Sequence, residues 1–243
     1  KAQYGTKHHL PPLYYHEGSD SNHDGPYAFY LHVTTMETSA FNVTVKRYNG
    51  TTVTTLANVS KTNPVTYQIG DSGGDWCDTN STGSECDYLY ADATGSTDED
   101  KGLILEATSN FYARVDVDAD PQAASYMSKG LFAQGKEFYS IHFEHAVKDN
   151  AGNFISVMAI EDDTDVKMTL PPGCSWDGLP VASDCGDGED YNFCTVDTGK
   201  SRVVRVYPAT GSEAADLAAL NDCIGTKIEA SKDIVVVSGS WSG

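Results

Sequence analysis

The sequence predicts an all-β protein, built either as one large β-sandwich or as two consecutive, jelly-roll-like sandwich halves with long disulfide-stapled loops and one short helix. Three observations predict it. Runs of alternating or β-branched residues recur along the 243-residue chain, Gly, Asn, Asp and Pro separate these runs, and Thr and Tyr suit half-buried pleated surfaces. About a dozen such runs with almost no helical pattern favour packed sheets.

The predicted strands follow one another at short intervals. They are residues 27–34, 41–48, 51–56, 65–69, 103–107, 111–117, 136–143, 154–160, 165–170, 201–207, 226–230 and 234–240. Asn49-Gly50 joins two of them with the dipeptide of a tight hairpin turn. Residues 111–119 alternate apolar with polar, which indicates a strand with one face in water. The one helical stretch is 213–221, with Ser212 as its N-cap.

Pro121 interrupts this succession of strands and divides the chain. We expect an extended amino-terminal arm over residues 1–23, a first sandwich half over 24–120 and a second over 121–243. Pro11-Pro12 favours an extended path for the arm, which either docks as a strand on the sheet edge of a neighbour or is a mobile terminus. The last strand pattern reaches the end of the chain, so we expect an excerpt of a longer protein.

The charge balance excludes two classes of partner. The chain has 35 acidic and 16 basic residues, a formal net charge of −19. Phosphate recognition needs clustered Lys and Arg, so a nucleic-acid partner is excluded. Apolar runs such as residues 234–237 are far shorter than the roughly 18–20 residues of a membrane helix, so membrane insertion is excluded as well.

The cysteines indicate export. Their number is even, and no C-x-x-C spacing suggests zinc or redox chemistry, so a disulfide set in an extracellular or cell-surface protein is the better interpretation. Six cysteines allow fifteen pairings. Our choice pairs the neighbours, so that the first two bonds each staple a short polar excursion: Cys77–Cys86, Cys174–Cys185 and Cys194–Cys223.

Four N-x-[S/T] sequons point to the same compartment and predict a glycoprotein. The acceptor residues are Asn42, Asn49, Asn58 and Asn80. Such short patterns also arise by chance in Thr-rich sequence.

Two long excursions, residues 71–101 and 171–191, interrupt the strands, and each contains one tryptophan. Loops of this length are usually functional or disordered. Trp76 and Trp176 are candidate binding residues that stack on a sugar or a protein, and the alternative is that each packs on its own disulfide.

Clustered carboxylates make Ca²⁺ the one cofactor for which the sequence offers a site. Asp184, Asp187, Glu189 and Asp190 lie in a Gly-punctuated acidic stretch that supplies some of the roughly 6–8 oxygens calcium takes. A second set, Asp116, Asp118 and Asp120, shares one strand face. The alternative is that both are solvated acidic segments.

No catalytic residues are predicted. The run Gly70-Asp71-Ser72-Gly73-Gly74 matches the nucleophile motif of trypsin-like proteases, but it lies in the first third of the chain and no Ala-His-Cys motif precedes it. His142 and His145 would lie on opposite faces of a strand, which is poor geometry for one metal. We therefore expect a protein that is not an enzyme.

Five stretches together resemble one family. They are Gly5-Thr-Lys-His-His-Leu-Pro-Pro-Leu13, Leu103-Ile-Leu-Glu-Ala-Thr108, Ala159-Ile-Glu-Asp-Asp-Thr164, Ile224-Gly-Thr-Lys-Ile-Glu-Ala230 and Lys232-Asp-Ile-Val-Val-Val-Ser-Gly-Ser240. The chain resembles the amino-terminal domain of the IgG-Fc-binding-protein family, found in mucin-like animal proteins and large bacterial surface proteins. Asp233 departs from the proline that is common there. The resemblance implies an extracellular β-rich module and carries no catalytic residues over.

The function expected from these observations is binding. We expect a secreted or surface-displayed, non-catalytic module for cell adhesion or structural assembly, including service as a subunit of an extracellular filament or coat. Its partners are other copies of itself or an extracellular protein or glycan. The alternative function is a carbohydrate-binding module that uses the loop Trp and Tyr residues.

Overall fold

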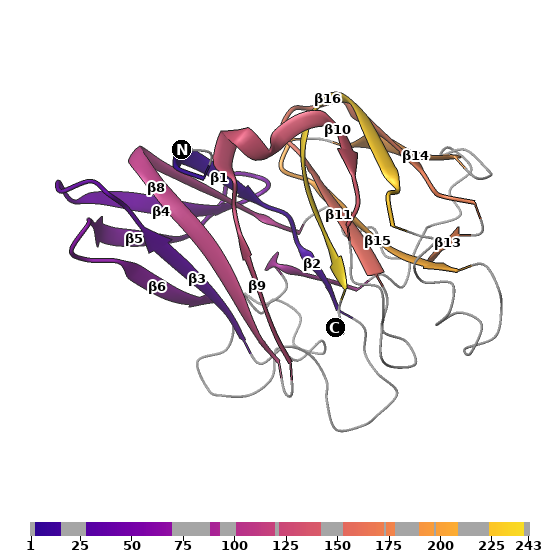
Figure 1. Cartoon of the computed structure of the whole chain (residues 1–243). Coiled ribbons are helices and arrows are strands. Elements are labelled where there is room, and N and C mark those ends of the chain that lie inside the picture. The colour runs from indigo at the N-terminus through magenta and orange to yellow at the C-terminus, as the bar shows by residue number, and fades with distance from the viewer. Residues whose placement is uncertain are drawn as a thin grey trace. The chain divides into compact units, whose positions relative to one another are not determined.

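The chain forms β-strands over nearly all of its described length (Figure 1). The computed structural model describes residues 3–15, 28–69, 88–92, 101–119, 122–141, 153–172, 174–177, 190–196, 198–208 and 224–240. These contain strands β1 to β16 and one short 3-10 turn, η3 (Gly130–Ala133). Within the described residues, no helix has the length and apolarity to cross a membrane. The all-β prediction is confirmed, and the sandwich layering stays a prediction.

Two compact units make up the chain. Unit 1 comprises Lys1–Leu10, Glu17–Tyr90 and Asp100–Gln134, and unit 2 comprises Pro11–His16, Ala91–Glu99 and Gly135–Gly243. The expected helix at 213–221 lies outside the described residues.

Unit 1 is a seven-stranded sheet in the order β5-β4-β8-β3-β6, in which β1 and β9 also pair with β8. Its strands are β1 (Gly5–Leu10), β3 (Ala28–Thr34), β4 (Phe41–Arg47), β5 (Thr52–Val59), β6 (Val65–Ile69), β8 (Leu103–Ala119) and β9 (Gln122–Met127). All of its described pairings are antiparallel.

The long strand β8 organises this unit by changing partners along its length. Its first part pairs with β4 as far as the Val43–Ala107 pair and with β1 as far as the Gly5–Phe111 pair. Its second part pairs with β3 and β9, starting at Thr34–Tyr112. Over residues 111–117 buried residues alternate with half-buried or exposed ones, as the period of a strand requires. The core beneath it consists of buried aliphatic and aromatic side chains: Phe29, Leu31, Val33, Val43, Val45, Leu56, Leu103, Leu105, Phe111, Ala113 and Val115.

Unit 2 contains a second seven-stranded sheet in the order β13-β15-β11-β16-β12-β14, in which β10 also pairs with β16. Its strands are β10 (Gln134–Tyr139), β11 (Asn153–Ala159), β12 (Thr164–Thr169), β13 (Cys174–Asp177), β14 (Asp190–Val196), β15 (Ser201–Pro208) and β16 (Lys227–Ser240). A two-stranded sheet of β2 (Leu13–Tyr15) and β7 (Tyr90–Asp92) completes the described strands.

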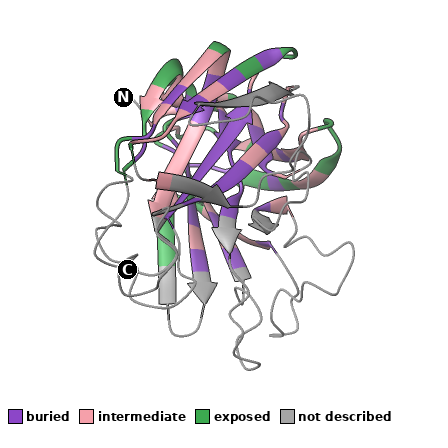
Figure 2. Ribbon diagram, turned by 90° about the vertical axis from the view of Figure 1, so that its right-hand side faces the viewer, coloured by how far each residue is buried: buried purple, intermediate pink, exposed green. Residues whose placement is uncertain are grey.

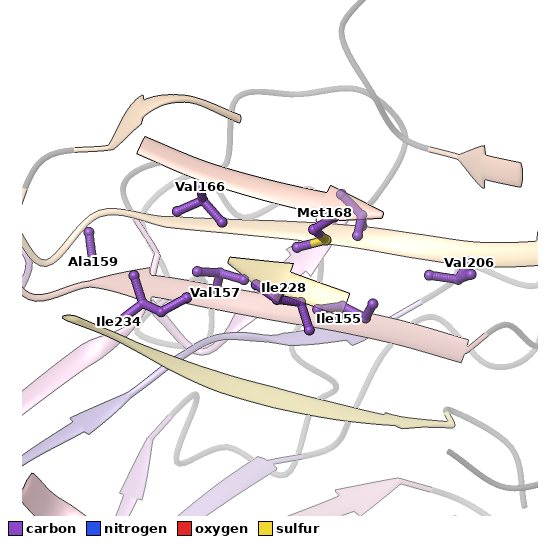
Figure 3. Packing of buried hydrophobic residues seen from close by; sticks show 9 residues of the cluster. Ile155, Val157, Ala159, Val166, Met168, Val206, Ile228 and Ile234 are labelled. Atoms are coloured by element: carbon purple, nitrogen blue, oxygen red, sulfur yellow. The ribbon is translucent and has the colours of Figure 1, made fainter. Parts of the chain in front are cut away.

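Strand β11 lies in the interior of the unit 2 strand order, and each of its seven residues is buried. Figure 2 shows buried residues running along several strands. On one face, Ile155, Val157 and Ala159 pack with side chains from β12, β15 and β16 (Figure 3). A strand buried on both faces reads as a continuous apolar run, which is why residues 154–160 were predictable as a strand.

In two places the structure forms one long strand where the sequence predicted two separate strands. Residues 103–107 and 111–117 form the single strand β8, and residues 226–230 and 234–240 form the single strand β16. In both cases the polar residues between the two patterns continue the strand instead of turning it.

Candidate functional site

Several sequence-predicted site residues lie outside the described residues, and their roles stay predictions. They are Trp76, Cys77, Asn80, Cys86, Asp184, Cys185, Asp187, Glu189 and Cys223.

The remaining loop residues fall on the two ends of the unit 2 sheet. Cys174 and Trp176 belong to β13, where Trp176 is opposite Val206 of β15. Asp190 and Cys194 belong to β14, at the other end of the strand order. Four strands stand between the strands of Trp176 and Asp190 in the order of this sheet, and the binding and metal roles of these residues stay predictions.

Several carboxylates of the described residues engage protein groups. Nowhere in the described part of the chain do three or more His, Cys, Asp or Glu side chains gather in a way that holds a metal ion. Asp116, from the predicted row on β8, has one carboxylate oxygen 2.6 Å from Arg114 Nε and the other 3.1 Å from His32 Nε2. Asp116 therefore acts in an exposed ion-pair group.

The acidic turn between β11 and β12 is stabilised by hydrogen bonds and has a structural role. Thr164 Oγ1 donates to Glu161 O at 2.6 Å, and Asp162 Oδ1 accepts the Thr198 backbone N–H at 2.9 Å. The hydrogen bonds from Thr198 hold the pKa of Asp162 below its usual value. Lys232 Nζ also donates to Asp162 O. The Ala159–Thr164 motif of the resemblance is thus explained by the turn that it closes.

A second motif of the resemblance closes the neighbouring turn before β16. Gly225 has φ of +88°, a left-handed conformation that favours glycine. Its N–H donates to Ser140 O at 3.0 Å, and the Ser140 N–H donates to Thr226 O at 2.9 Å. These bonds fix the residues after β10 against the start of β16.

An apolar surface lies at this turn. We call Tyr139, Ile141 and Ile224 the β10-end surface; their exposed fractions are 59%, 74% and 40%. Ser140 separates the first two in sequence, and its two backbone hydrogen bonds join this segment to Gly225 and Thr226, the two residues that follow Ile224. Among the described strands β10 pairs only with β16, and a strand with one partner is an edge at which another chain can pair. The surface and the edge are together suited to binding a protein.

Unit 1 contains a buried polar network around His8, which is fully buried. His8 Nε2 lies 3.0 Å from Phe111 O, and Nδ1 lies 2.9 Å from Ser128 Oγ. A carbonyl only accepts, so Nε2 carries the proton and neutral Nδ1 accepts from the Ser128 hydroxyl. Ser128 Oγ in turn accepts the Gly130 N–H at 3.3 Å. The network connects β1, β8 and η3, and desolvation lowers the pKa of His8.

His9, its neighbour on β1, is buried without such partners. Neither ring nitrogen has a hydrogen-bond partner among the described residues. Desolvation lowers its pKa to about 4, assisted by nearby Lys7. On the exposed side, Glu106 lies 3.0 Å from Lys7 Nζ and 2.5 Å from Lys46 Nζ, and the hydrogen bond from Lys46 contributes most to lowering the Glu106 pKa. Residues 5–10 of the predicted arm are therefore an integral strand of unit 1.

Sequence reasoning missed both of these features. The six residues of β1, Gly-Thr-Lys-His-His-Leu, have little β-propensity, so only the resemblance singled them out. The β10-end surface depends on the approach of residue 140 to residues 225 and 226, which is a long-range contact without a local signal.

Among the comparisons with known proteins, one family model matches a segment of the chain. No curated protein and no solved structure matches the chain. A family model described as "IgGFc binding protein" matches residues 124–242. These residues include the Ala159–Thr164, 224–230 and 232–240 motifs. The segment 124–242 therefore matches the IgGFc binding protein family, and the resemblance predicted from the sequence is confirmed.

Proposed function

We propose that the chain is an extracellular, non-catalytic module that binds other proteins in adhesion or structural assembly, and that the β10-end surface is its contact site. The observation that carries the proposal is the exposed apolar cluster of Tyr139, Ile141 and Ile224 inside the segment that matches a binding-protein family.

The chemistry of this surface supports protein binding. Exposed aromatic and large aliphatic side chains are typical of the anchor residues of interfaces. Burying one such side chain contributes about 1.5–3 kcal/mol. The open edge of β10 adds main-chain N–H and C=O groups, which allow a partner strand to align with it.

A disulfide supports an extracellular setting, and the family description suggests which partners to test. Cys174, at the start of β13, is disulfide-bonded, and disulfides persist mainly in oxidising compartments. The family description names a protein that binds the Fc part of an antibody, so the Fc fragment is one probe for this chain and a second copy of the chain is the other.

The net charge shapes how copies of the chain meet. Two molecules of charge −19 repel each other, and added salt screens this repulsion. Self-association through an apolar surface is therefore expected to strengthen as the salt concentration rises, whereas assembly through ion pairs would weaken.

The test combines sedimentation velocity over a range of protein concentrations with binding of purified Fc fragment to the immobilised chain. We expect larger species or Fc binding from the wild type, and we expect Ile141→Lys to weaken whichever occurs by about tenfold or more. Met36→Lys is the matched control, because Met36 is 60% exposed in unit 1. A wild-type chain that stays monomeric at every concentration and leaves the Fc fragment unbound contradicts the proposal.

A further inference from the structure

Three of the four sequons lie on one hairpin of unit 1. Asn42 is in β4, Asn49 is in the turn, and Asn58 is in β5; all three residues are exposed. Two residues after each stands the Thr or Ser that a sequon requires.

The hydrogen bonds of this hairpin leave the reacting atoms accessible. Asn49 Oδ1 accepts the Thr51 N–H at 3.0 Å, and Asn42 Oδ1 accepts the Asn58 N–H at 3.2 Å. Both amides are thus held through their oxygen. Within the described residues no hydrogen bond involves the side-chain nitrogen of any of the three asparagines.

We propose that Asn42, Asn49 and Asn58 are N-glycosylated and that their glycans shield the β5 edge of the unit 1 sheet. The donor is a lipid-linked oligosaccharide diphosphate. A bond forms between Nδ2 and C1 of the first sugar, the bond from C1 to the diphosphate oxygen breaks, and the lipid diphosphate leaves with that electron pair. The amide nitrogen loses one proton to the transferring enzyme or water.

The position of the three asparagines on the β4–β5 strand pair explains how their glycans would shield the β5 edge. β5 pairs with β4 alone among the described strands, so its far edge offers unpaired backbone groups to another chain. Asn49 lies at the turn, while Asn42 and Asn58 lie together at the opposite end, where the pairing register shifts between Phe41 and Val43. Bulky, hydrated sugars at both ends of the hairpin hinder strand addition along β5, which leaves the β10 edge of unit 2 for protein contacts.

The first experiment measures the modification on the native protein. Peptide mass spectrometry before and after peptide N-glycosidase treatment is expected to show glycans on the three asparagines, each converted to aspartate on release. In a secretory host, Thr44→Ala, Thr51→Ala and Ser60→Ala are each expected to remove one glycan. These changes keep the hydrogen bonds of the asparagine side chains, and Thr44→Ser is the matched control that retains its glycan. Unmodified Asn42, Asn49 and Asn58 in the native protein overturn the proposal.

The second experiment measures the shielding. The intact protein and the enzymatically deglycosylated protein are compared by sedimentation and by hydrogen–deuterium exchange of residues 52–59. We expect the deglycosylated protein to associate further and to gain exchange protection in β5. Unchanged association and exchange overturn the shielding role.

These outcomes are separate from those of the proposed function, although both rest on export of the chain. Association through β5 persists in Ile141→Lys, whereas association through the β10-end surface does not. Absent glycans leave the binding proposal standing, and a failed binding test leaves the glycan analysis valid.

Discussion

In unit 1 the long strand β8 changes partners within a partly buried polar network, whereas in unit 2 the long strand β16 changes partners at an exposed turn. In β8 the change falls at residues 108–111, where Thr35 Oγ1 donates to Asn110 O at 2.7 Å and His8 donates to Phe111 O. The bonds that fasten this change are made by uncharged groups.

In β16 the change falls between the last β12 pair at Ala230 and the first β11 pair at Ile234. Lys136 Nζ donates to Ser231 O at 2.9 Å, the Asp165 N–H donates to Ser231 Oγ at 2.9 Å, and Lys232 binds Asp162 O. These bonds are exposed, and two of them come from lysine ammonium groups. Both units thus contain a long strand that pairs with several others. In unit 1 the hydrogen bonds at the change of partner are buried or partly buried, whereas in unit 2 they are exposed to water. We therefore expect different substitutions and solution conditions to destabilise the two units.

The largest effect is expected from His8→Ala. The substitution leaves Phe111 O and Ser128 without their partner and opens a cavity, so we expect a loss of about 3 kcal/mol in the free energy of unfolding. Urea unfolding measures it. The control is His32→Ala, since His32 makes only exposed contacts and its loss is expected to cost less than about 1 kcal/mol. Equal losses in the free energy of unfolding for the two variants would show that the buried contacts of His8 contribute no more than the exposed contacts of His32.

Acid is expected to destabilise unit 1 through His9. Its folded pKa is about 4, below the ordinary 6.5, so between these values the unfolded state binds more protons and stability falls as the pH falls. The difference in pKa corresponds to about 3 kcal/mol lost by pH 4. His9→Leu removes the group.

The measurement for His9 is the free energy of unfolding from pH 7 to pH 4 for both proteins. We expect the wild-type curve to fall more steeply than that of His9→Leu across this range. Parallel curves would show that His9 does not titrate in the way its burial indicates.

Two glycines with a left-handed backbone conformation allow a comparison in which smaller losses of stability are expected. Gly130 has φ of +57°, and a Cβ there would lie 3.3 Å from His8 Cε1, whereas Gly225 has φ of +88° and open space around it. We expect Gly130→Ala to cost about 2 kcal/mol and Gly225→Ala about 1 kcal/mol, because left-handed backbone alone costs roughly 1–2 kcal/mol. Thermal unfolding of the two variants measures the difference, and a costlier Gly225→Ala would contradict it.

The smallest effect is expected from the exposed turn of unit 2. Asp162→Ala removes the acceptor for the Thr198 N–H, and we expect a small decrease in melting temperature that shrinks further at high salt. Ser231→Ala is the control, since the hydroxyl that accepts from the Asp165 N–H is uncharged. A decrease that does not depend on salt for Asp162→Ala would show that the charge is not what matters there.

The sequence predicted the all-β class and most inner strands, because these strands carry a strong apolar pattern. Val65–Ile69 was predicted with its observed bounds. The sequence prediction failed where polar residues lie within one strand. Thr108-Ser109-Asn110 and Ser231-Lys232-Asp233 have the composition of turns, yet they remain extended between the paired residues that precede and follow them. No local pattern encodes such a change of partner.

The candidate site was less predictable than the fold. The sequence drew attention to loop tryptophans and acidic clusters, whereas the exposed cluster arises from three apolar residues that look ordinary one by one. The segments that contain Ile141 and Ile224 are joined by the backbone hydrogen bonds between Ser140 and residues 225 and 226. By contrast, the exposure of Asn42, Asn49 and Asn58 follows from the hairpin that the sequence did predict.

The most direct test of the binding account is hydrogen–deuterium exchange of the native protein alone at low concentration and then with its partner present, either the Fc fragment or the chain itself at high concentration. The account predicts slower exchange in the residues around Tyr139, Ser140 and Ile141 and in residues 224–226, with β5 unaffected. Protection confined to unit 1, with exchange around Ile141 unchanged in the complex, would contradict it.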